Sequence, residues 1–243
     1  MNIRYSTQYA ESPSITPSQQ IAISRFISRT YGWMFLGLAL TGFVSYFMAS
    51  SELTAQMMAE HRGIFMVALI AEFALVMVLS AAFQKLSAAT ATLGFLGYSA
   101  LNGVTLSLIF LSYSMNSIGQ VFFITAGMFG GLALFGTVTK KNLSGVGSFV
   151  GMGLWGLIIV GLVNMFVQSE AISMGLGVVG VVVFAGLTAY HAQSIRSMAY
   201  QSTVSGYSED EANKGAIFGA LMLYLNFINL FLSLLRLFGG RRD

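Results

Sequence analysis

The polar side chains that lie within long apolar segments are the groups of this sequence most able to do chemistry. Near the C-terminus, Asn226, Asn229, Ser233 and Arg236 follow one another at steps of three, four and three residues. This spacing places all four on one face of a helix. Because a polar stripe is unstable against lipid, the pattern predicts a helix in the interior of the protein. Its stripe either forms structural hydrogen bonds or lines a path for ions.

Three further polar side chains interrupt apolar segments. Glu72 lies mid-segment, where burying a charged carboxylate in a bilayer costs about 2.5 kcal/mol or more. We expect Glu72 to be neutral or to face the protein interior, as a proton or cation relay or as a hydrogen-bonded packing residue. Asn102 is expected to bond across helices or to line a pathway. His191, near the end of a segment, either compensates a helix dipole or senses protons.

Seven apolar stretches position these residues. Hydrophobic residues make up 56% of the 243 residues, charged residues 9%, and the mean hydropathy is +0.75, which excludes a soluble domain. A helix needs roughly 20 residues to cross a bilayer. The expected spans are 31–50, 63–83, 88–112, 120–139, 146–167, 172–192 and 215–239. We therefore predict an all-α integral membrane protein with seven transmembrane helices. Its expected parts are a polar segment with an interfacial helix at 1–30, a transmembrane domain at 31–239 and a basic tail at 240–243.

Local signals mark where two of the helices begin. Thr16, Pro17 and Gln19 have the types and spacing of a capping box with proline at the first helical position. Ser208 and Glu211 have the same capping spacing before the last span. This cap, rather than a cation site, is the favoured explanation of the acidic cluster there.

Glycines at a spacing of four residues predict close helix packing. The pairs are Gly147 with Gly151 and Gly215 with Gly219. Small residues let helix backbones approach where lipid supplies no hydrophobic drive.

Basic residues indicate how the chain crosses the membrane. Eight lie on the side of the N-terminus: Arg4, Arg25, Arg29, Lys85, Lys140, Lys141, Arg196 and Lys214. The other side has four, of which Arg236, Arg241 and Arg242 are at the C-terminus. Since Lys and Arg are retained in the cytoplasm, the N-terminus is expected there and the C-terminus outside, unless the last helix does not cross fully. The scattered charges do not indicate nucleic-acid binding.

The sequence favours no enzyme and no cofactor. It has no cysteine, which excludes disulfides and cysteine metal sites, and its aspartates, Asp210 and Asp243, lie outside the expected spans. Intramembrane aspartyl proteolysis needs two aspartates in the spans, and zinc proteolysis needs a His-Glu-x-x-His helix. Serine proteolysis needs a Gly-x-Ser-x motif with a partner histidine. We expect none of these sites, nor any metal site.

Two C-terminal segments carry a resemblance to a known family. Residues 186–193 (GLTAYHAQ) and 223–236 (LYLNFINLFLSLLR) resemble the sixth-helix and last-helix motifs of the Bax inhibitor-1 family, and 125–130 and 140–145 are similar to its bacterial members. The match extends over about 29–242. It implies a bacterial inner-membrane protein of seven helices, with the last surrounded by the other six. It also implies a pH-sensitive calcium leak or a regulator of membrane proteostasis and stress.

The sequence departs from the family at its pH-sensing residues. The resemblance implies two aspartates that share a proton and latch the cytoplasmic mouth, but His191 and Asn226 stand at those positions. Such a pair has at most one proton switch and offers calcium one amide oxygen. The resemblance also implies a basic residue in the latch, at the cytoplasmic end of the second helix. Lys85 is its nearest match in this sequence, although it would repel a protonated histidine. Two functions therefore remain open: a calcium or proton leak with an altered latch, and a non-conducting regulator that binds a partner such as a membrane-anchored protease.

Overall fold

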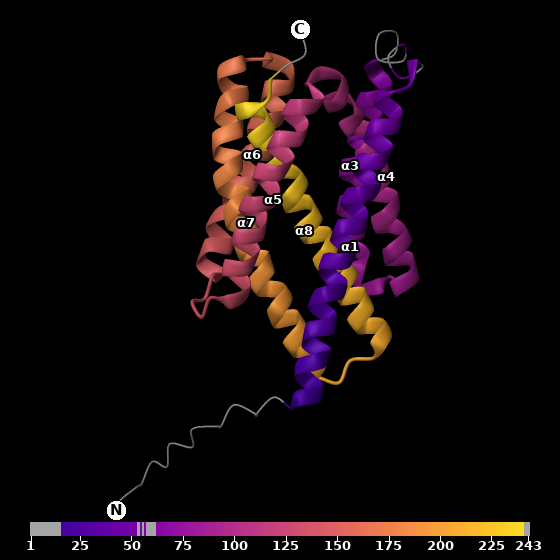
Figure 1. Cartoon of the computed structure of the whole chain (residues 1–243), viewed down its shortest axis with the longest axis vertical. Coiled ribbons are helices and arrows are strands. Elements are labelled where there is room, and N and C mark those ends of the chain that lie inside the picture. Colours follow the sequence, from indigo (N-terminus) through magenta and orange to yellow (C-terminus); the bar gives the residue numbers. More distant parts are fainter. Residues whose placement is uncertain (1–15, 53, 55, 57–61, 241–243) are drawn as a thin grey trace, which may run out of the picture.

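The computed structural model describes residues 16–52, 54, 56 and 62–240, and these residues form a bundle of long helices (Figure 1). The first part of the predicted polar segment, residues 1–15, lies outside them. The helices are α1 (Pro17–Ala49), α3 (Arg62–Ala82), α4 (Ala88–Ser112), α5 (Met115–Val138), α6 (Ser144–Val167), α7 (Glu170–Val204) and α8 (Glu209–Phe238), with a short 3-10 helix, η1 (Phe83–Lys85), after α3.

The lengths and hydropathy of the helices confirm the predicted fold class. Six are long and apolar enough to cross a membrane, and in α3 a shorter apolar stretch is described, Met66–Ala82. Successive helices run in alternate directions, so that the start of α1 and the end of α8 lie at opposite ends of the bundle (Figure 1). The last helix extends through the whole bundle.

The two predicted helix caps are present. Oγ1 of Thr16 accepts a hydrogen bond from the Gln19 amide, and the Gln19 side chain accepts one from the Thr16 amide. Ser208 and Glu211 form the same reciprocal pair at the start of α8. These caps satisfy amides that the helix itself leaves unpaired.

Two helices extend more than ten residues beyond the spans expected from hydropathy. The lead-in segment and the first span form one continuous helix, α1. The sixth span was expected to end at residue 192, but α7 continues to Val204, with Ile195, Ala199 and Ser202 buried. Hydropathy marks where the apolar stretch ends, whereas packing of these small and apolar side chains keeps the polar extension helical.

The C-terminal helix α8 is the centre of the bundle. In its most apolar stretch 72% of the residues are buried, compared with 44% or fewer in each of the other five long apolar helices. It packs against α7, α1, α5 and α4, and Figure 1 shows it passing diagonally between them. The expectation that six helices surround it needs correction for two of them, because α3 packs mainly on α4, and α6 packs mainly on α7 with only 11% of its apolar stretch buried.

Three of the four predicted glycines lie at close helix contacts. A Cβ on Gly147 would lie 2.6 Å from the Tyr190 ring, one on Gly215 would lie 3.2 Å from Phe26, and one on Gly219 would lie 3.0 Å from Thr30. Gly151 has open space around it. Spacing alone therefore did not distinguish a packed glycine from one on the outer face.

Gly136 makes the tightest backbone contact and gives a stability prediction. A Cβ there would collide with the carbonyl oxygen of Ala189, so α5 and α7 must separate to accept a methyl group. Gly136→Ala is expected to cost about 1–3 kcal/mol and to lower the Tm of the detergent-solubilised protein. Gly131→Ala is the control, because Gly131 is exposed on the same helix with nothing within 4 Å. Equal Tm values for the two variants would contradict this account of the contact.

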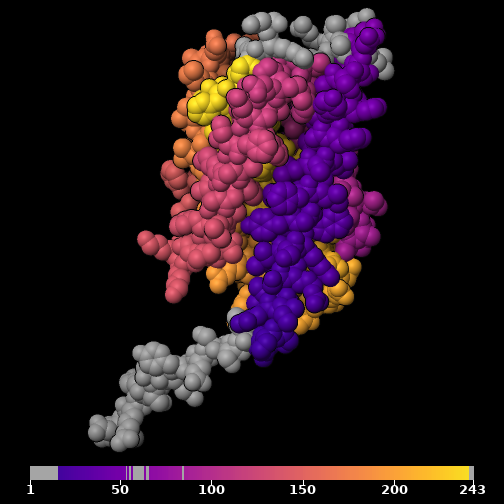
Figure 2. Space-filling model, viewed as in Figure 1, coloured from indigo at the N-terminus to yellow at the C-terminus, as the bar shows by residue number. Residues whose placement is uncertain are grey.

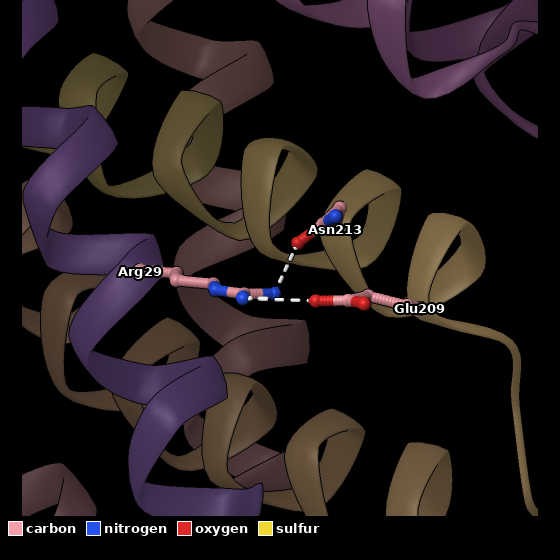
Figure 3. A network of polar contacts seen from close by, with 3 residues as sticks. All are labelled: Arg29, Glu209 and Asn213. Carbon is pink, nitrogen blue, oxygen red and sulfur yellow. Dashed lines mark hydrogen bonds and ion pairs between the residues drawn. The ribbon is translucent and has the colours of Figure 1, made fainter.

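The first and last helices are joined near their N-terminal ends. Arg29 of α1 donates to Oδ1 of Asn213 at 2.5 Å and pairs with Oε1 of Glu209 at 3.1 Å (Figure 3). The ion pair is solvent-exposed, and such pairs stabilise by about 0–1 kcal/mol. Its main effect is to fix the start of α8 against α1.

Candidate functional site

A buried carboxylate in α3 is the centre of a polar network. Glu72 is 9% exposed, and Tyr98, Asn102 and Thr105 all donate hydrogen bonds to it. The Tyr98 hydroxyl lies 3.3 Å from Oε1 of Glu72 and Thr105 Oγ1 lies 2.9 Å from Oε2. The three donors are spaced four and three residues apart on α4, which puts them on one face. These hydrogen bonds offset part of the cost of burying the carboxylate.

The network continues through α8 to α1. Tyr224 is fully buried, and its hydroxyl donates to Oδ1 of Asn102 at 3.0 Å. The same hydroxyl lies 2.7 Å from Oγ1 of Thr41, whose one hydrogen is donated either to Tyr224 or to the carbonyl of Ser99, 2.8 Å away. A connected chain of polar groups therefore joins α3, α4, α8 and α1 inside the bundle.

A cavity of about 580 Å³ lies beside this network. Its polar lining comes from Glu72, Tyr98, Asn102, Thr105, Tyr113, Asn229, Ser233 and Arg236. Most of the remaining lining is apolar and includes residues of α6 and α7. Three members of the predicted α8 stripe therefore share one cavity with the predicted carboxylate.

Within the stripe, the donors of two residues are used by the helix itself. Asn229 Nδ2 donates to the carbonyl of Leu225 at 2.8 Å, and Ser233 Oγ donates to the carbonyl of Asn229 at 2.7 Å. Their oxygen atoms remain as acceptors along the cavity. Arg236 is exposed in the last turn of α8, where its charge complements the helix dipole.

The structure pairs His191 with Asn226. Nδ2 of Asn226 lies 2.8 Å from Nδ1 of His191, and Asn226 is 3% exposed. Since an amide nitrogen can only donate, Nδ1 must accept and carries no proton in this arrangement. Protonation of His191 would place two donors opposite each other, unless the amide turns to present its oxygen. Asn226 lies one helical turn before Asn229, which lines the cavity. The His191–Asn226 pair therefore lies next to the cavity, although neither residue belongs to its lining.

Lys85 lies apart from this pair. It is exposed at the end of η1, and within the described part of the chain no hydrogen bond or ion pair joins it to His191 or Asn226. The neighbouring Phe83 stacks on Phe218, with ring centroids 4.4 Å apart. Phe218 precedes Asn226 by eight residues, or roughly 12 Å along α8.

Sequence reasoning missed several members of the network: Thr41, Tyr98, Thr105 and Tyr224. A signal for two of them was available, because Tyr98 and Thr105 lie at helical spacing on either side of Asn102. Nothing local marks Thr41 or Tyr224, whose partners are more than 50 residues away in sequence.

The chain contains the Gly-x-Ser spacing of a serine nucleophile, although no serine site is expected. Gly97-Tyr98-Ser99 and Gly206-Tyr207-Ser208 both have the Gly-x-Ser spacing. The structure assigns both serines to local structure: Ser99 donates to the carbonyl of Phe95 at 2.9 Å, and Ser208 caps α8. The described residues contain no cluster of three or more His, Cys, Asp or Glu side chains that could hold a metal ion.

Comparison with known proteins decides the family. The family model described as inhibitor of apoptosis-promoting Bax1 matches residues 23–243. The chain belongs to the Bax inhibitor-1 family. Among its Bax inhibitor-1 relatives, the inner membrane protein YbhL of Escherichia coli is 45% identical over 220 residues, covering 90% of this chain and 93% of YbhL. A Deinococcus radiodurans protein is 44% identical over 234 residues (93% and 98% covered), and one from Borreliella burgdorferi is 41% identical over 226 residues (93% and 96%).

Proposed function

We propose that this Bax inhibitor-1 family protein is a proton-regulated leak for protons or small monovalent cations in a bacterial inner membrane. The observation that carries the proposal is the buried carboxylate of Glu72 facing a cavity of about 580 Å³. An ionisable group at this depth is unfavourable against lipid and is typical of ion and proton pathways. The inner-membrane assignment follows the name of the YbhL relative. The excess of basic residues on the side of the N-terminus supports a cytoplasmic position for that end.

The donor set favours a proton or monovalent cation over calcium. Glu72 supplies one carboxylate, and its neighbours supply hydroxyl and amide groups. Calcium takes 6–8 oxygen ligands, usually with several carboxylates. The remaining acceptors along α8, Asn229 and Ser233, are neutral oxygens. They suit the passage of a proton or a partly hydrated monovalent ion.

The His191–Asn226 pair serves as the gate in this proposal. When His191 is neutral, its hydrogen bond with Asn226 holds α7 against α8 next to the cavity. A proton on Nδ1 replaces the acceptor by a donor, so the hydrogen bond from the Asn226 amide nitrogen breaks. Acidification therefore opens the leak.

A pH series tests the leak and its gate. Purified protein in proteoliposomes is expected to pass protons or potassium at least about five-fold faster at the acid end of a series from pH 8 to pH 4.5, the change that about 1 kcal/mol of gating energy produces. His191→Gln keeps a hydrogen-bonding side chain but cannot titrate, so its flux is expected to be independent of pH. Flux equal to that of empty vesicles at every pH would end the proposal, and a pH response retained by His191→Gln would remove the gate.

The outer surface of α6 supports a second function, regulation of a partner membrane protein without conduction. The helix exposes Trp155 and has open space around Gly151 and Gly156. Such positions let a partner helix approach closely. Crosslinking at native expression, with a photoreactive group at Met152 on this face, should capture a membrane-anchored protease or another quality-control protein. Recovery of no partner, combined with measured flux, would leave the leak as the function.

A further inference from the structure

An apolar groove separates α1 from α5 on the outer surface of the bundle. It has a volume of about 410 Å³, and its floor is Phe227 of the central helix. Its walls include Ile27, Tyr31 and Phe35 of α1 and Ala126, Gly130 and Thr137 of α5. Figure 2 shows the indigo α1 and the pink α5 side by side on this face, with parts of α8 visible between them. In a membrane-spanning bundle, this groove opens sideways to the lipid tails.

The length of the groove matches one leaflet of a bilayer. It extends along α5 from Ala126 to Thr137, eleven residues or roughly 16 Å of helix. Half of a hydrocarbon core of about 30 Å is about 15 Å. An acyl chain of one leaflet therefore fits along the groove with its headgroup at the end marked by Thr137.

Cationic side chains gather at that end. Nη1 of Arg196 on α7 donates to the carbonyl of Thr137 at 2.6 Å, which places the guanidinium at the end of the groove. Lys140 and Lys141 follow Thr137 by three and four residues and border a small polar hollow with Gln193 of α7. A guanidinium carries five N–H donors in a fork that matches phosphate oxygens. The N–H donors of Arg196 that do not point at Thr137 are suited to bind a phosphate group.

Negative charge is scarce in the segment of the chain that carries these cations. Between Met115 and Ser208 the sequence has one acidic residue, Glu170. It begins α7, 26 residues or roughly 39 Å of helix before Arg196. The acidic cluster at the start of α8 includes Glu209, which pairs with Arg29. The end of the groove therefore favours an anionic ligand.

We propose that the groove binds an anionic phospholipid, with one acyl chain between α1 and α5 and its phosphate at Arg196 and Lys140. The bound lipid contacts Phe227, which follows Asn226 in α8, and Arg196, which lies five residues after His191 in α7. This site does not depend on ion conduction, and its test measures lipid binding rather than flux.

Native mass spectrometry and thermal unfolding of the full chain in neutral detergent test the site. Phosphatidylglycerol is expected to bind at least about ten-fold more tightly than phosphatidylcholine and to raise the Tm, because both lipids carry a phosphate but the cationic choline group of the second is repelled by Arg196 and Lys140. Inorganic phosphate without acyl chains should give no shift, which distinguishes a lipid from a free anion.

Variants separate the headgroup site from the groove. Arg196→Gln should lose the preference for phosphatidylglycerol, and Arg196→Lys should retain part of it. Gly130→Phe fills the groove, since open space surrounds Gly130, and should abolish binding of both lipids. Gly131→Phe, also in open space but outside the groove, should bind as the parent does. Equal affinity for the two phospholipids in the parent, or unchanged binding in both Arg196→Gln and Gly130→Phe, would overturn the proposal. Should Arg196→Gln not fold, Gly130→Phe against Gly131→Phe still decides it.

Discussion

Glu72→Gln is expected to reduce cation flux in proteoliposomes by at least about ten-fold. The substitution keeps the size of the side chain and an oxygen for the donors on α4, but it removes the group that can carry a negative charge beside the cavity. Two unit charges about 4 Å apart attract by about 4 kcal/mol at an effective dielectric constant of 20, whereas a ten-fold effect needs only about 1.4 kcal/mol. Flux of protons and of potassium, measured separately, would show which ion depends on the carboxylate.

The matched control for this experiment is Glu170→Gln. Glu170 is exposed at the start of α7 and lies outside the cavity. Its flux should stay within about two-fold of the parent, because an exposed charge in high dielectric interacts weakly with an ion in the cavity. A parent-like flux in Glu72→Gln, with the protein folded by circular dichroism, would remove Glu72 from the pathway.

The second large effect is expected from replacing the gate pair by two carboxylates. His191→Asp combined with Asn226→Asp should create a calcium leak that closes in acid. The parent pair lies 2.8 Å apart, and two carboxylates at this distance share one proton at low pH. Loss of that proton at higher pH makes them repel and open the contact, while two carboxylates also supply calcium with hard oxygen ligands. The pH response should therefore be opposite in sign to that of the parent.

A mismatched pair serves as the control for this double variant. His191→Asp combined with Asn229→Asp introduces the same two charges, but Asn229 is bonded to the carbonyl of Leu225 rather than to His191. It should give no acid-closed calcium leak. Calcium traces that are the same across pH for the double variant and the parent would show that the contact does not gate.

Local sequence signals account for most of the fold. Hydropathy over windows of about 20 residues located the helices, because crossing a bilayer is a property of each segment alone. The caps at Thr16 and Ser208 depend on residues three positions apart. The central position of α8 followed from its polar stripe, since such a stripe is excluded from lipid.

The candidate site could be predicted only in part. The stripe suggested a common role for its members, but Asn226 contacts His191 while Asn229 and Ser233 bond to their own helix and border the cavity. Spacing fixes the face of a helix but not which neighbour that face meets. The partners of Glu72 on α4, and the connection through Tyr224 to Thr41, depend on contacts between distant segments.

The central position of α8 also has a consequence for biogenesis. The most buried helix is made after the other described helices, so these enter the bilayer with their inner faces unmatched. Until α8 arrives, Asn102 and Thr41 lack the hydroxyl of Tyr224 that joins them in the finished protein. A nascent chain halted before Gly215 would therefore expose unsatisfied polar groups in the membrane, the kind of unfinished intermediate that insertion chaperones shield and quality-control proteases remove.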